Sequence, residues 1–258
     1  MRSKNPEPSS LDLNVEEIKK FYDSVYYANA HDKKEDRIRG HYARLFKRLK
    51  IGRDARILDV ACGAGGWLKV CQEHGARVSG VDLSENAIAV CQERMPSGDF
   101  HAQPAETLPF DDAQFDVVTC LGSLEHFVDP KNSLQEMVRV AKQGAIFIIL
   151  VPNKDFLTRK LGLFRGTYQV DAKEVVRTLD DWRQLFAGAG LTIEERWKDL
   201  HVINRGWVMT GKIYLWPFRA LQCLCLLLWP LKWQYQVYHR CLASSQATTA
   251  NSARAHAR

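Results

Sequence analysis

A glycine-rich turn followed by an acidic strand end is the part of this sequence best suited to chemistry. Residues 57–66, ILDVACGAGG, begin as an apolar strand and pass through glycines into a predicted helix. Glycines at such a turn let the backbone approach a bound nucleoside closely. The next predicted strand ends at Asp82, whose carboxylate can accept hydrogen bonds from both hydroxyls of a ribose. The pattern therefore predicts a nucleoside site at the carboxyl ends of two neighbouring strands.

Two details argue against a dinucleotide as the ligand of this turn. The fingerprint G-x-G-x-x-G, started at Gly63, requires glycine at a position where the sequence has Leu68. Asp59 precedes the turn, and its negative charge would repel a pyrophosphate. The same charge suits a ligand that carries an ammonium and a sulfonium. A plain strand–helix turn is the alternative interpretation, and the ordered acids and later motifs argue against it.

The motifs in their order resemble those of class I S-adenosylmethionine-dependent methyltransferases of the type 11 group. They are Asp59-x-Ala61-Cys62-Gly63-x-Gly65, then Asp82, then AETLPF at 105–110, FDVV at 115–118 and LEHF at 124–127. The resemblance covers residues 55–195, and several ordered motifs are more specific than one glycine turn. It implies an enzyme whose cofactor is S-adenosylmethionine. The LEH segment resembles the ubiquinone-pathway O-methyltransferases in particular.

The resemblance also implies which residues surround the cofactor. The expected cofactor-binding residues are Asp59, Ala61, Gly63 and Gly65 at the methionine part, Asp82 at the ribose, Leu83, Ala105 and Glu106 at the adenine, and Leu121 at the methionine end. Two positions depart from the family pattern. Ala61 replaces the first glycine of the usual turn, and Pro104 stands where the family often has an aspartate that binds the adenine amino group. Adenine recognition is therefore expected from Glu106 or from backbone.

His126 is the candidate catalytic residue. Positioning of the nucleophile supplies much of the catalysis in methyl transfer, and a base is needed only where a hydroxyl must lose its proton. His126 follows a predicted strand at the ligand-binding edge, and the ordinary histidine pKa suits proton removal near neutrality. Capping or packing of the next helix is the equally weighted alternative. Some relatives bind a divalent metal with the Glu125-His126 pair and a further glutamate, but Gly122 holds that place, so no metal site is predicted.

Alternating strands and helices must position these residues. Strands are expected at 56–60, 77–81, 99–102, 115–120, 145–151 and 191–197, and helices at 36–50, 67–74, 85–94, 130–142 and 179–189. Gly144 is expected to stop the helix at 130–142. The alternation predicts an α/β, Rossmann-like, doubly wound and mostly parallel sheet with helices on both faces. N-terminal lid helices and a C-terminal aromatic-rich helical extension complete the expected fold.

The chain is expected to divide into four segments. They are an N-terminal tail with lid helices at 1–54, the methyltransferase core at 55–205, an apolar and aromatic extension at 206–243, and a disordered tail at 244–258. Aromatic and histidine side chains outside the methyltransferase core could line the acceptor pocket or could only pack within the lid. They are Tyr22, Tyr26, Tyr27 and His41 in the lid, and His201 after the last strand.

Composition indicates a globular protein of a reducing compartment. Of the 258 residues, 46% are hydrophobic and 26% charged, which is ordinary for a soluble domain. The seven cysteines match no zinc or haem spacing and are expected to be free thiols. The polar N-terminus has no apolar signal region, so a cytoplasmic location is expected. Peripheral contact with the inner face of the membrane is compatible with that location.

The segment at 206–240 combines tryptophans and basic residues beside an uncharged run of twelve residues, 220–231. A helix of that length spans about 18 Å, too short for a bilayer core of about 30 Å. A membrane surface contact and a core or dimer contact remain open for this segment. Nucleic acid is not an expected partner, because no nucleic-acid motif accompanies the basic residues.

The expected function is methyl transfer to a small, amphiphilic acceptor of isoprenoid, aromatic or lipid-linked type, with oxygen as the preferred target atom. Two alternatives remain. One is a methyltransferase of a glycan or other polar metabolite, in which the C-terminal segment serves as core. The other is a non-catalytic S-adenosylmethionine-binding module associated with a membrane pathway. The sequence leaves the oligomeric state open.

Overall fold

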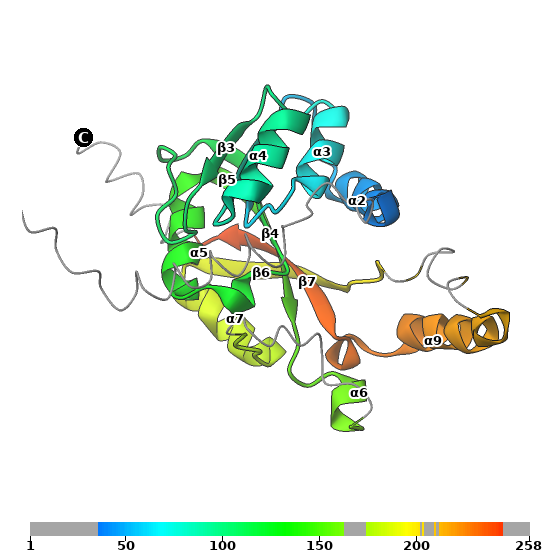
Figure 1. Ribbon diagram of the computed structural model, residues 1–258. Helices are drawn as coiled ribbons and strands as arrows, with labels where there is room; N and C mark the ends of the chain where they lie inside the picture. Colours follow the sequence, from blue (N-terminus) through cyan, green and yellow to red (C-terminus); the bar gives the residue numbers. More distant parts are fainter. Residues whose placement is uncertain (1–35, 163–173, 202, 204–208, 210–211, 245–258) are drawn as a thin grey trace, which may run out of the picture.

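A seven-stranded sheet forms the centre of the computed structural model, which describes residues 36–162, 174–201, 203, 209 and 212–244 (Figure 1). The strands lie in the order β3-β2-β1-β4-β5-β7-β6. In chain order they are β1 Arg56–Val60, β2 Arg77–Asp82, β3 Asp99–Ala102, β4 Phe115–Leu121, β5 Ala141–Pro152, β6 Leu191–Lys198 and β7 Gln236–Ala243. Only β7 runs antiparallel to its neighbours. The expected mostly parallel, Rossmann-like sheet is confirmed.

Helices cover both faces of this sheet, as expected for a doubly wound fold (Figure 1). The helices are α2 Asp36–Leu49, α3 Gly66–Glu73, α4 Glu85–Arg94, α5 Pro130–Val140, α6 Leu157–Lys160, α7 Leu179–Gly188 and α9 Trp216–Leu228, with short turns η2 Leu124–His126, η3 Ile213–Leu215 and η4 Leu231–Trp233. Apolar side chains of α2, α3 and α4 join one buried cluster, and those of α5 and α7 join another. The sheet separates the two clusters.

The C-terminal segment departs from the sequence-based expectation. Residues 206–243 were expected to form a helical extension outside the core, and α9 is indeed helical. Gln236–Ala243, however, forms β7, which lies inside the sheet between β5 and β6. The expectation of an extension that is helical throughout was therefore wrong. Val237, Tyr238, His239 and Cys241 are buried there. Tyr238 packs in the cluster on one face of the sheet and Cys241 in the cluster on the other.

Gly144 does not stop a helix. Helix α5 ends at Val140, and β5 begins at the next residue. Gly144 has φ +77° and lies where the register of β4 against β5 shifts, between the pairs Phe115–Ala141 and Val117–Ile146. Its left-handed backbone serves a bulge inside β5. The apolar part of β5 then runs unbroken to Val151, as a strand buried on both faces requires.

The carboxyl ends of the parallel strands meet at one edge of the sheet, which we call the carboxyl edge. Asp59 and Asp82 lie at the ends of β1 and β2 there, and Leu121 ends β4. Because β7 is antiparallel, its first residue, Gln236, pairs with Pro152 at the same edge. Open α/β sheets bind ligands beyond this edge. Among the described helices, none is long and apolar enough to cross a bilayer.

Candidate active site

The glycine-rich turn after β1 is built from left-handed backbone. Ala61, Gly63 and Gly65 have φ values of +62°, +53° and +78°. A β-carbon at position 65 would lie 2.6 Å from Cε of Met95 and 2.9 Å from Sγ of Cys91, so glycine lets the turn pack against α4. Ala61 adopts a conformation that glycine adopts at lower cost. The turn is therefore held close to α4, and its backbone faces the carboxyl edge.

Asp82 ties this turn to the start of α4. Its Oδ2 accepts a hydrogen bond of 2.8 Å from the N–H of Gly63, and its Oδ1 accepts one of 2.9 Å from the N–H of Ser84. The hydroxyl of Ser84 in turn caps α4 by accepting from the N–H of Ala87. Sequence reasoning assigned Asp82 to the ribose alone. The structure gives its buried carboxylate an additional backbone role, which the short spacing to Ser84 could have suggested.

Asp59 is a buried acid at the end of β1, with only 3% of its surface exposed. Burial raises its pKa to about 7, a hydrogen bond from the Thr119 hydroxyl opposes this rise, and the nearby Asp82 charge adds to it. Thr119 Oγ1 lies 2.5 Å from Asp59 Oδ1. No ion pair to Asp59 occurs within the described ranges. A cationic ligand would supply a partner for this carboxylate. The ammonium and sulfonium groups of S-adenosylmethionine are cations of that kind, so the site fits this cofactor.

The other expected cofactor residues lie along the same edge with different exposures. Leu83 and Leu121 are half-buried, and Ala105 is buried. Glu106 has a second task, because its Oε1 accepts a 3.1 Å hydrogen bond from the N–H of Asp129 at the start of α5. Its backbone carbonyl accepts from the side chain of Asn132. Glu106 therefore joins its loop to α5, and contact with the adenine remains a prediction.

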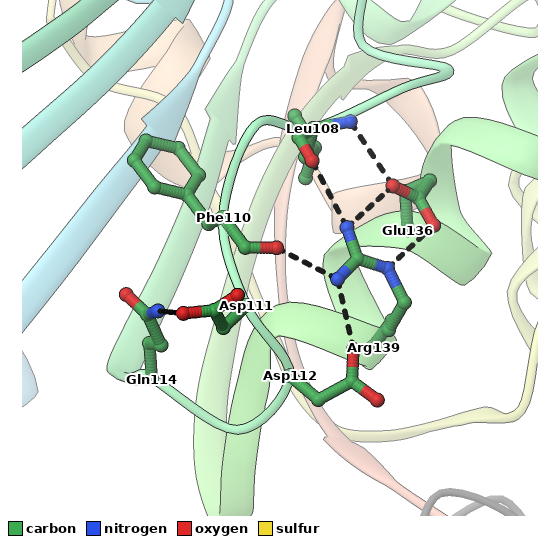
Figure 2. A network of polar contacts seen from close by, with 7 residues as sticks. All are labelled: Leu108, Phe110, Asp111, Asp112, Gln114, Glu136 and Arg139. Carbon is green, nitrogen blue, oxygen red and sulfur yellow. Dashed lines mark hydrogen bonds and ion pairs between the residues drawn. The ribbon is translucent and has the colours of Figure 1, made fainter. Parts of the chain in front are cut away.

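A half-buried arginine holds the loop that follows Glu106 (Figure 2). Arg139 of α5 donates hydrogen bonds to the carbonyls of Leu108 and Phe110 and to the carboxylates of Asp112 and Glu136. Glu136 also accepts from the N–H of Leu108. Hydrogen bonds to Glu136, more than those to Asp112, raise the pKa of Arg139. The network holds the loop at 108–112 against α5. Sequence reasoning missed it because the partners in the loop lie 27 to 31 residues before Arg139.

His126, the predicted base, ends the turn η2 at the carboxyl edge. Its neighbour Glu125 is buried, and burial raises the pKa of that carboxyl to about 8. Within the described residues no group of three His, Cys, Asp or Glu side chains is arranged to hold a metal ion. The catalytic role of His126 stays a prediction that rests on position.

A second group of polar side chains lies at the carboxyl edge beyond β6 and β7. We call His41, Asp199, His201 and Tyr238 the polar cluster. His41 Nε2 lies 2.9 Å from the Tyr238 hydroxyl and 3.5 Å from Asp199 Oδ1. His201 Nδ1 lies 2.5 Å from Asp199 Oδ2, and the two histidine rings meet edge-on at 6.1 Å. The structure therefore brings His41 and His201 together, while Tyr22, Tyr26 and Tyr27 fall outside the described residues.

Burial and neighbouring charges shift the pKa of three members of the polar cluster. Burial raises the pKa of Tyr238, and the carboxylates of Asp199 and Asp59 raise it further. A hydrogen bond to Asp199 raises the pKa of His201, whereas burial lowers the pKa of His41. Sequence reasoning found the two histidines separately and missed Asp199 and Tyr238. The cluster joins α2, β7 and the segment after β6, so no local pattern could reveal it.

Comparisons with known proteins agree with this architecture. A family model described as a methyltransferase domain matches residues 58–149. The chain is 33% identical over 167 residues to the demethylmenaquinone methyltransferase of Renibacterium salmoninarum, covering 62% of this chain and 67% of that protein. It is 33% identical over 104 residues to the ubiquinone biosynthesis O-methyltransferase of Coxiella burnetii, covering 39% and 44%. The chain therefore spans two thirds of the first relative and less than half of the second.

Solved structures share the fold at lower identity. One is the 1,6-didemethyltoxoflavin-N1-methyltransferase of Burkholderia thailandensis, bound to 1,6-didemethyltoxoflavin and S-adenosylhomocysteine. It superposes with a TM-score of 0.62 at 17% identity, and the match covers 94% of each chain. At this identity the likeness shows the fold and says nothing about the acceptor.

Proposed function

The chain belongs to the class I S-adenosylmethionine-dependent methyltransferases, and from that premise we propose that it methylates a hydroxyl oxygen of a small, amphiphilic acceptor related to quinones. S-adenosylmethionine supplies an electrophilic methyl group. The buried Asp59 would pair with the cofactor's positive charge, and the glycine turn would hold its methionine part. Asp82 would accept from the ribose while it keeps its bonds to the turn.

The names of two relatives support the acceptor class. One is named for demethylmenaquinone, and the other for O-methylation in ubiquinone biosynthesis. Both names refer to quinones, whose reduced forms are apolar aromatic rings that carry hydroxyl groups. Oxygen as the target atom rests on the second name and on the histidines at the carboxyl edge, because a hydroxyl needs a base to remove its proton.

Helix α9 is the observation that carries the amphiphilic part of the proposal. Of its thirteen residues only Cys223 is buried. The exposed large apolar residues of this region are Ile213, Tyr214, Phe218, Leu221, Leu224, Leu227 and Leu228. Exposure reaches 71% at Phe218 and 74% at Leu228, far above what a core helix shows. Under the alternative of a glycan or other polar acceptor, the C-terminal segment was expected to belong to the hydrophobic core. Helix α9 does not belong to it.

Helix α9 is held by side chains at and near the carboxyl edge of the sheet. The Lys198 ammonium, at the end of β6, donates a 2.6 Å hydrogen bond to the carbonyl of Leu227. The side chain of Gln234 donates to the carbonyls of Leu226 and Trp229. The helix otherwise projects from the body of the molecule (Figure 1). An apolar surface at this edge would bring an acceptor that partitions into lipid close to the methyl donor.

The occupant that we propose for this surface is an anionic membrane. No Asp or Glu occurs from residue 200 to residue 258, whereas Lys212, Arg219 and Lys232 flank the apolar residues. Basic residues near an anionic lipid surface contribute about 1 kcal/mol each. Tryptophan and tyrosine, which favour membrane interfaces, are also gathered here, as at Tyr214 and Trp216. A second copy of the chain would present the same positive charges, which would repel those of the first copy.

The acceptor proposal is tested with two catechols that differ in one substituent. The full chain is incubated with S-adenosylmethionine and a catechol bearing a short isoprenoid chain, or a catechol bearing a glucosyl group. We expect a methyl ether and S-adenosylhomocysteine, with at least about a tenfold higher kcat/KM for the isoprenoid compound, which is about 1.4 kcal/mol. A carbon-methylated product would refute oxygen as the target. A preference for the glucosyl compound would refute the amphiphilic acceptor.

The membrane contact is tested by flotation with vesicles of phosphatidylglycerol and phosphatidylcholine. Deleting residues 206–240 would remove most of β7, so point substitutions are required. Phe218→Asp combined with Leu221→Asp places two charges at positions that are 71% and 57% exposed, and should abolish flotation. Gln184→Asp, on the exposed side of α7, adds a charge elsewhere and should float like the parent. Unchanged flotation of the double variant, or a change only in its oligomeric state, would refute the membrane as occupant.

A further inference from the structure

We propose that the basic face of α2 is a second contact for the anionic membrane, in addition to the apolar surface of α9. The basic face consists of Arg39, Arg44, Lys47, Arg48 and Lys50. The inference rests on the proposed membrane contact and supplies its charged part. Residues 36–56, which contain α2 and the loop to β1, hold eight Arg or Lys residues and two Asp residues. Their formal charge of +6 equals that of the whole chain, so the rest of the protein is neutral on balance.

The two faces of α2 differ sharply in chemistry. Leu45, Phe46 and Leu49 are buried in the cluster on one face of the sheet. On the other side of the helix, Gly40 is the only exposed position between residues 39 and 50 that is not an arginine or a lysine. A helix face that is exposed only to water commonly mixes both signs of charge, which form pairs along the helix. The exposed face of α2 carries one sign.

The protein's own carboxylates neutralise only part of the basic face. Arg39 and Arg48 form ion pairs with glutamates of α3 and β6. In the part of the chain that the structure describes, no carboxylate forms an ion pair with Arg44, Lys47 or Lys50. Like charges three or four positions apart on a helix repel one another and destabilise it slightly. An anionic surface would remove this repulsion, so the three cations fit a negatively charged partner.

The last residues of β6 join α2 to α9. The guanidinium of Arg48 lies over the ring of Trp197, 4.5 Å from its centroid. The next residue, Lys198, donates a hydrogen bond to the carbonyl of Leu227 on α9. Figure 1 shows both helices on the side of the molecule toward which β6 runs. The basic face and the apolar surface are therefore connected through the end of β6, which is the continuity that one membrane-binding surface requires.

The chemistry of the two surfaces favours a bilayer over a nucleic acid as the partner. The basic face has cations for phosphate groups, but it has no aromatic or amide side chain that would stack on bases or read their edges. The exposed leucines of α9 have no counterpart on a nucleic acid. A bilayer interface takes both kinds of side chain, because cations meet the lipid phosphates and apolar groups enter the acyl boundary.

The size of the effect follows from the number of cations that lack an acidic partner. Each Lys or Arg near an anionic lipid surface strengthens binding about fivefold, so Lys47 and Lys50 together should contribute about 30-fold. This contribution should shrink as salt is added, because charges in water are screened over about 10 Å at 0.1 M salt. Burial of the apolar residues of α9 lacks that dependence, so salt separates the two contacts.

The test measures how strongly the full chain partitions into vesicles of phosphatidylglycerol and phosphatidylcholine, at low and high salt. Lys47→Gln combined with Lys50→Gln should lower the partition coefficient about 30-fold at low salt and much less at high salt. The matched control is Lys131→Gln combined with Arg183→Gln, which removes two exposed charges from α5 and α7 over the other face of the sheet. The control should bind within about twofold of the parent, because these positions lie outside the proposed contact.

The outcomes separate this inference from the membrane contact on which it rests. Lys47→Arg combined with Lys50→Arg keeps the charge and should bind like the parent. If the parent binds the vesicles and the glutamine variant binds equally well, or the control loses as much, the role of α2 alone is overturned. A parent that does not bind the vesicles overturns the membrane contact as well. Tighter binding of the parent to a fluorescent single-stranded RNA than to the vesicles, lost in the glutamine variant, overturns the membrane as the partner of α2.

Discussion

Glycine at position 65 should be required for packing as well as for backbone conformation, and the two costs can be measured separately. Gly65→Ala places a side chain at φ +78°, where a β-carbon would lie 2.6 Å from Cε of Met95 and 2.9 Å from Sγ of Cys91. Gly144→Ala places the same side chain at φ +77°, where nothing lies within 4 Å of the β-carbon. The second variant therefore measures the left-handed backbone alone.

The expected magnitudes follow from these geometries. An L-residue in the left-handed region costs about 1–2 kcal/mol, and the loss of glycine's freedom in the unfolded chain returns about 0.4–1 kcal/mol. Gly144→Ala should therefore lower the free energy of unfolding by about 1 kcal/mol. Overpacking adds about 1–3 kcal/mol at position 65, so Gly65→Ala should cost about 3 kcal/mol. The flexible end of Met95 can move, but Cys91 is buried and fixed on α4.

Urea denaturation of the parent and both variants measures these differences. In thermal unfolding of this chain of 258 residues, the expected falls in Tm are about 2–4 °C for Gly144→Ala and about 6–12 °C for Gly65→Ala. Calorimetry should show weaker S-adenosylmethionine binding in Gly65→Ala and unchanged binding in Gly144→Ala, because only the first displaces the turn. Equal destabilisation by the two substitutions would refute the packing argument.

Four further predictions concern charged side chains at the candidate site and in the loop beside it. Affinity for S-adenosylmethionine should rise about tenfold per pH unit up to about pH 7. Burial raises the pKa of Asp59 to about 7, and this carboxyl must lose its proton to pair with a cation. Calorimetry at a series of pH values measures the slope, which Asp59→Asn should abolish. The same raised pKa makes the unliganded protein lose stability as pH rises from about 4 to about 7, since the folded state holds the proton more tightly than the unfolded chain. Arg139→Met should lower the free energy of unfolding by about 3 kcal/mol, because two carbonyls and two carboxylates lose their hydrogen-bond donor. Arg183→Met, at an exposed ion pair with Asp180, should cost less than about 0.5 kcal/mol. A similar cost in both variants would contradict the role of the Arg139 network. Asp82→Ala should lower the free energy of unfolding by about 2–6 kcal/mol, because the N–H groups of Gly63 and Ser84 lose their acceptor. Asp82→Asn, which keeps one acceptor oxygen, should lower it by about half as much. Urea titrations of both variants measure these costs, and equal costs would show that the two hydrogen bonds contribute nothing.

The core sheet was predictable because its signals are local. Strand Asp99–Ala102 was predicted with its observed bounds, and the helix predicted at 36–50 is observed at Asp36–Leu49. Each has a periodic apolar pattern. Asp59, Asp82 and the glycine turn were found for the same reason, since one βαβ unit contains them all.

The remaining features depend on partners far apart in the chain. The sequence of β7 mixes polar and apolar residues after a long apolar run, and its strand character comes from pairing with β5 about 90 residues earlier. Gly144 was assigned to a helix end because glycine serves bulges and caps equally well. The polar cluster depends on Tyr238 meeting His41 across 197 positions, and no spacing rule reaches that far.

The position of β7 also determines when the sheet can be completed during synthesis. In the part of the chain that the structure describes, β6 pairs only with β7, so β6 has no partner until residue 243 has left the ribosome. Until then β5 presents its apolar run, Ile146 to Val151, as an open sheet edge. The nascent chain therefore carries an incomplete sheet with an open β5 edge from the synthesis of Pro152 until that of Ala243, and the sheet is completed by inserting β7. We therefore expect chains that end before β7 to aggregate through the open edge of β5.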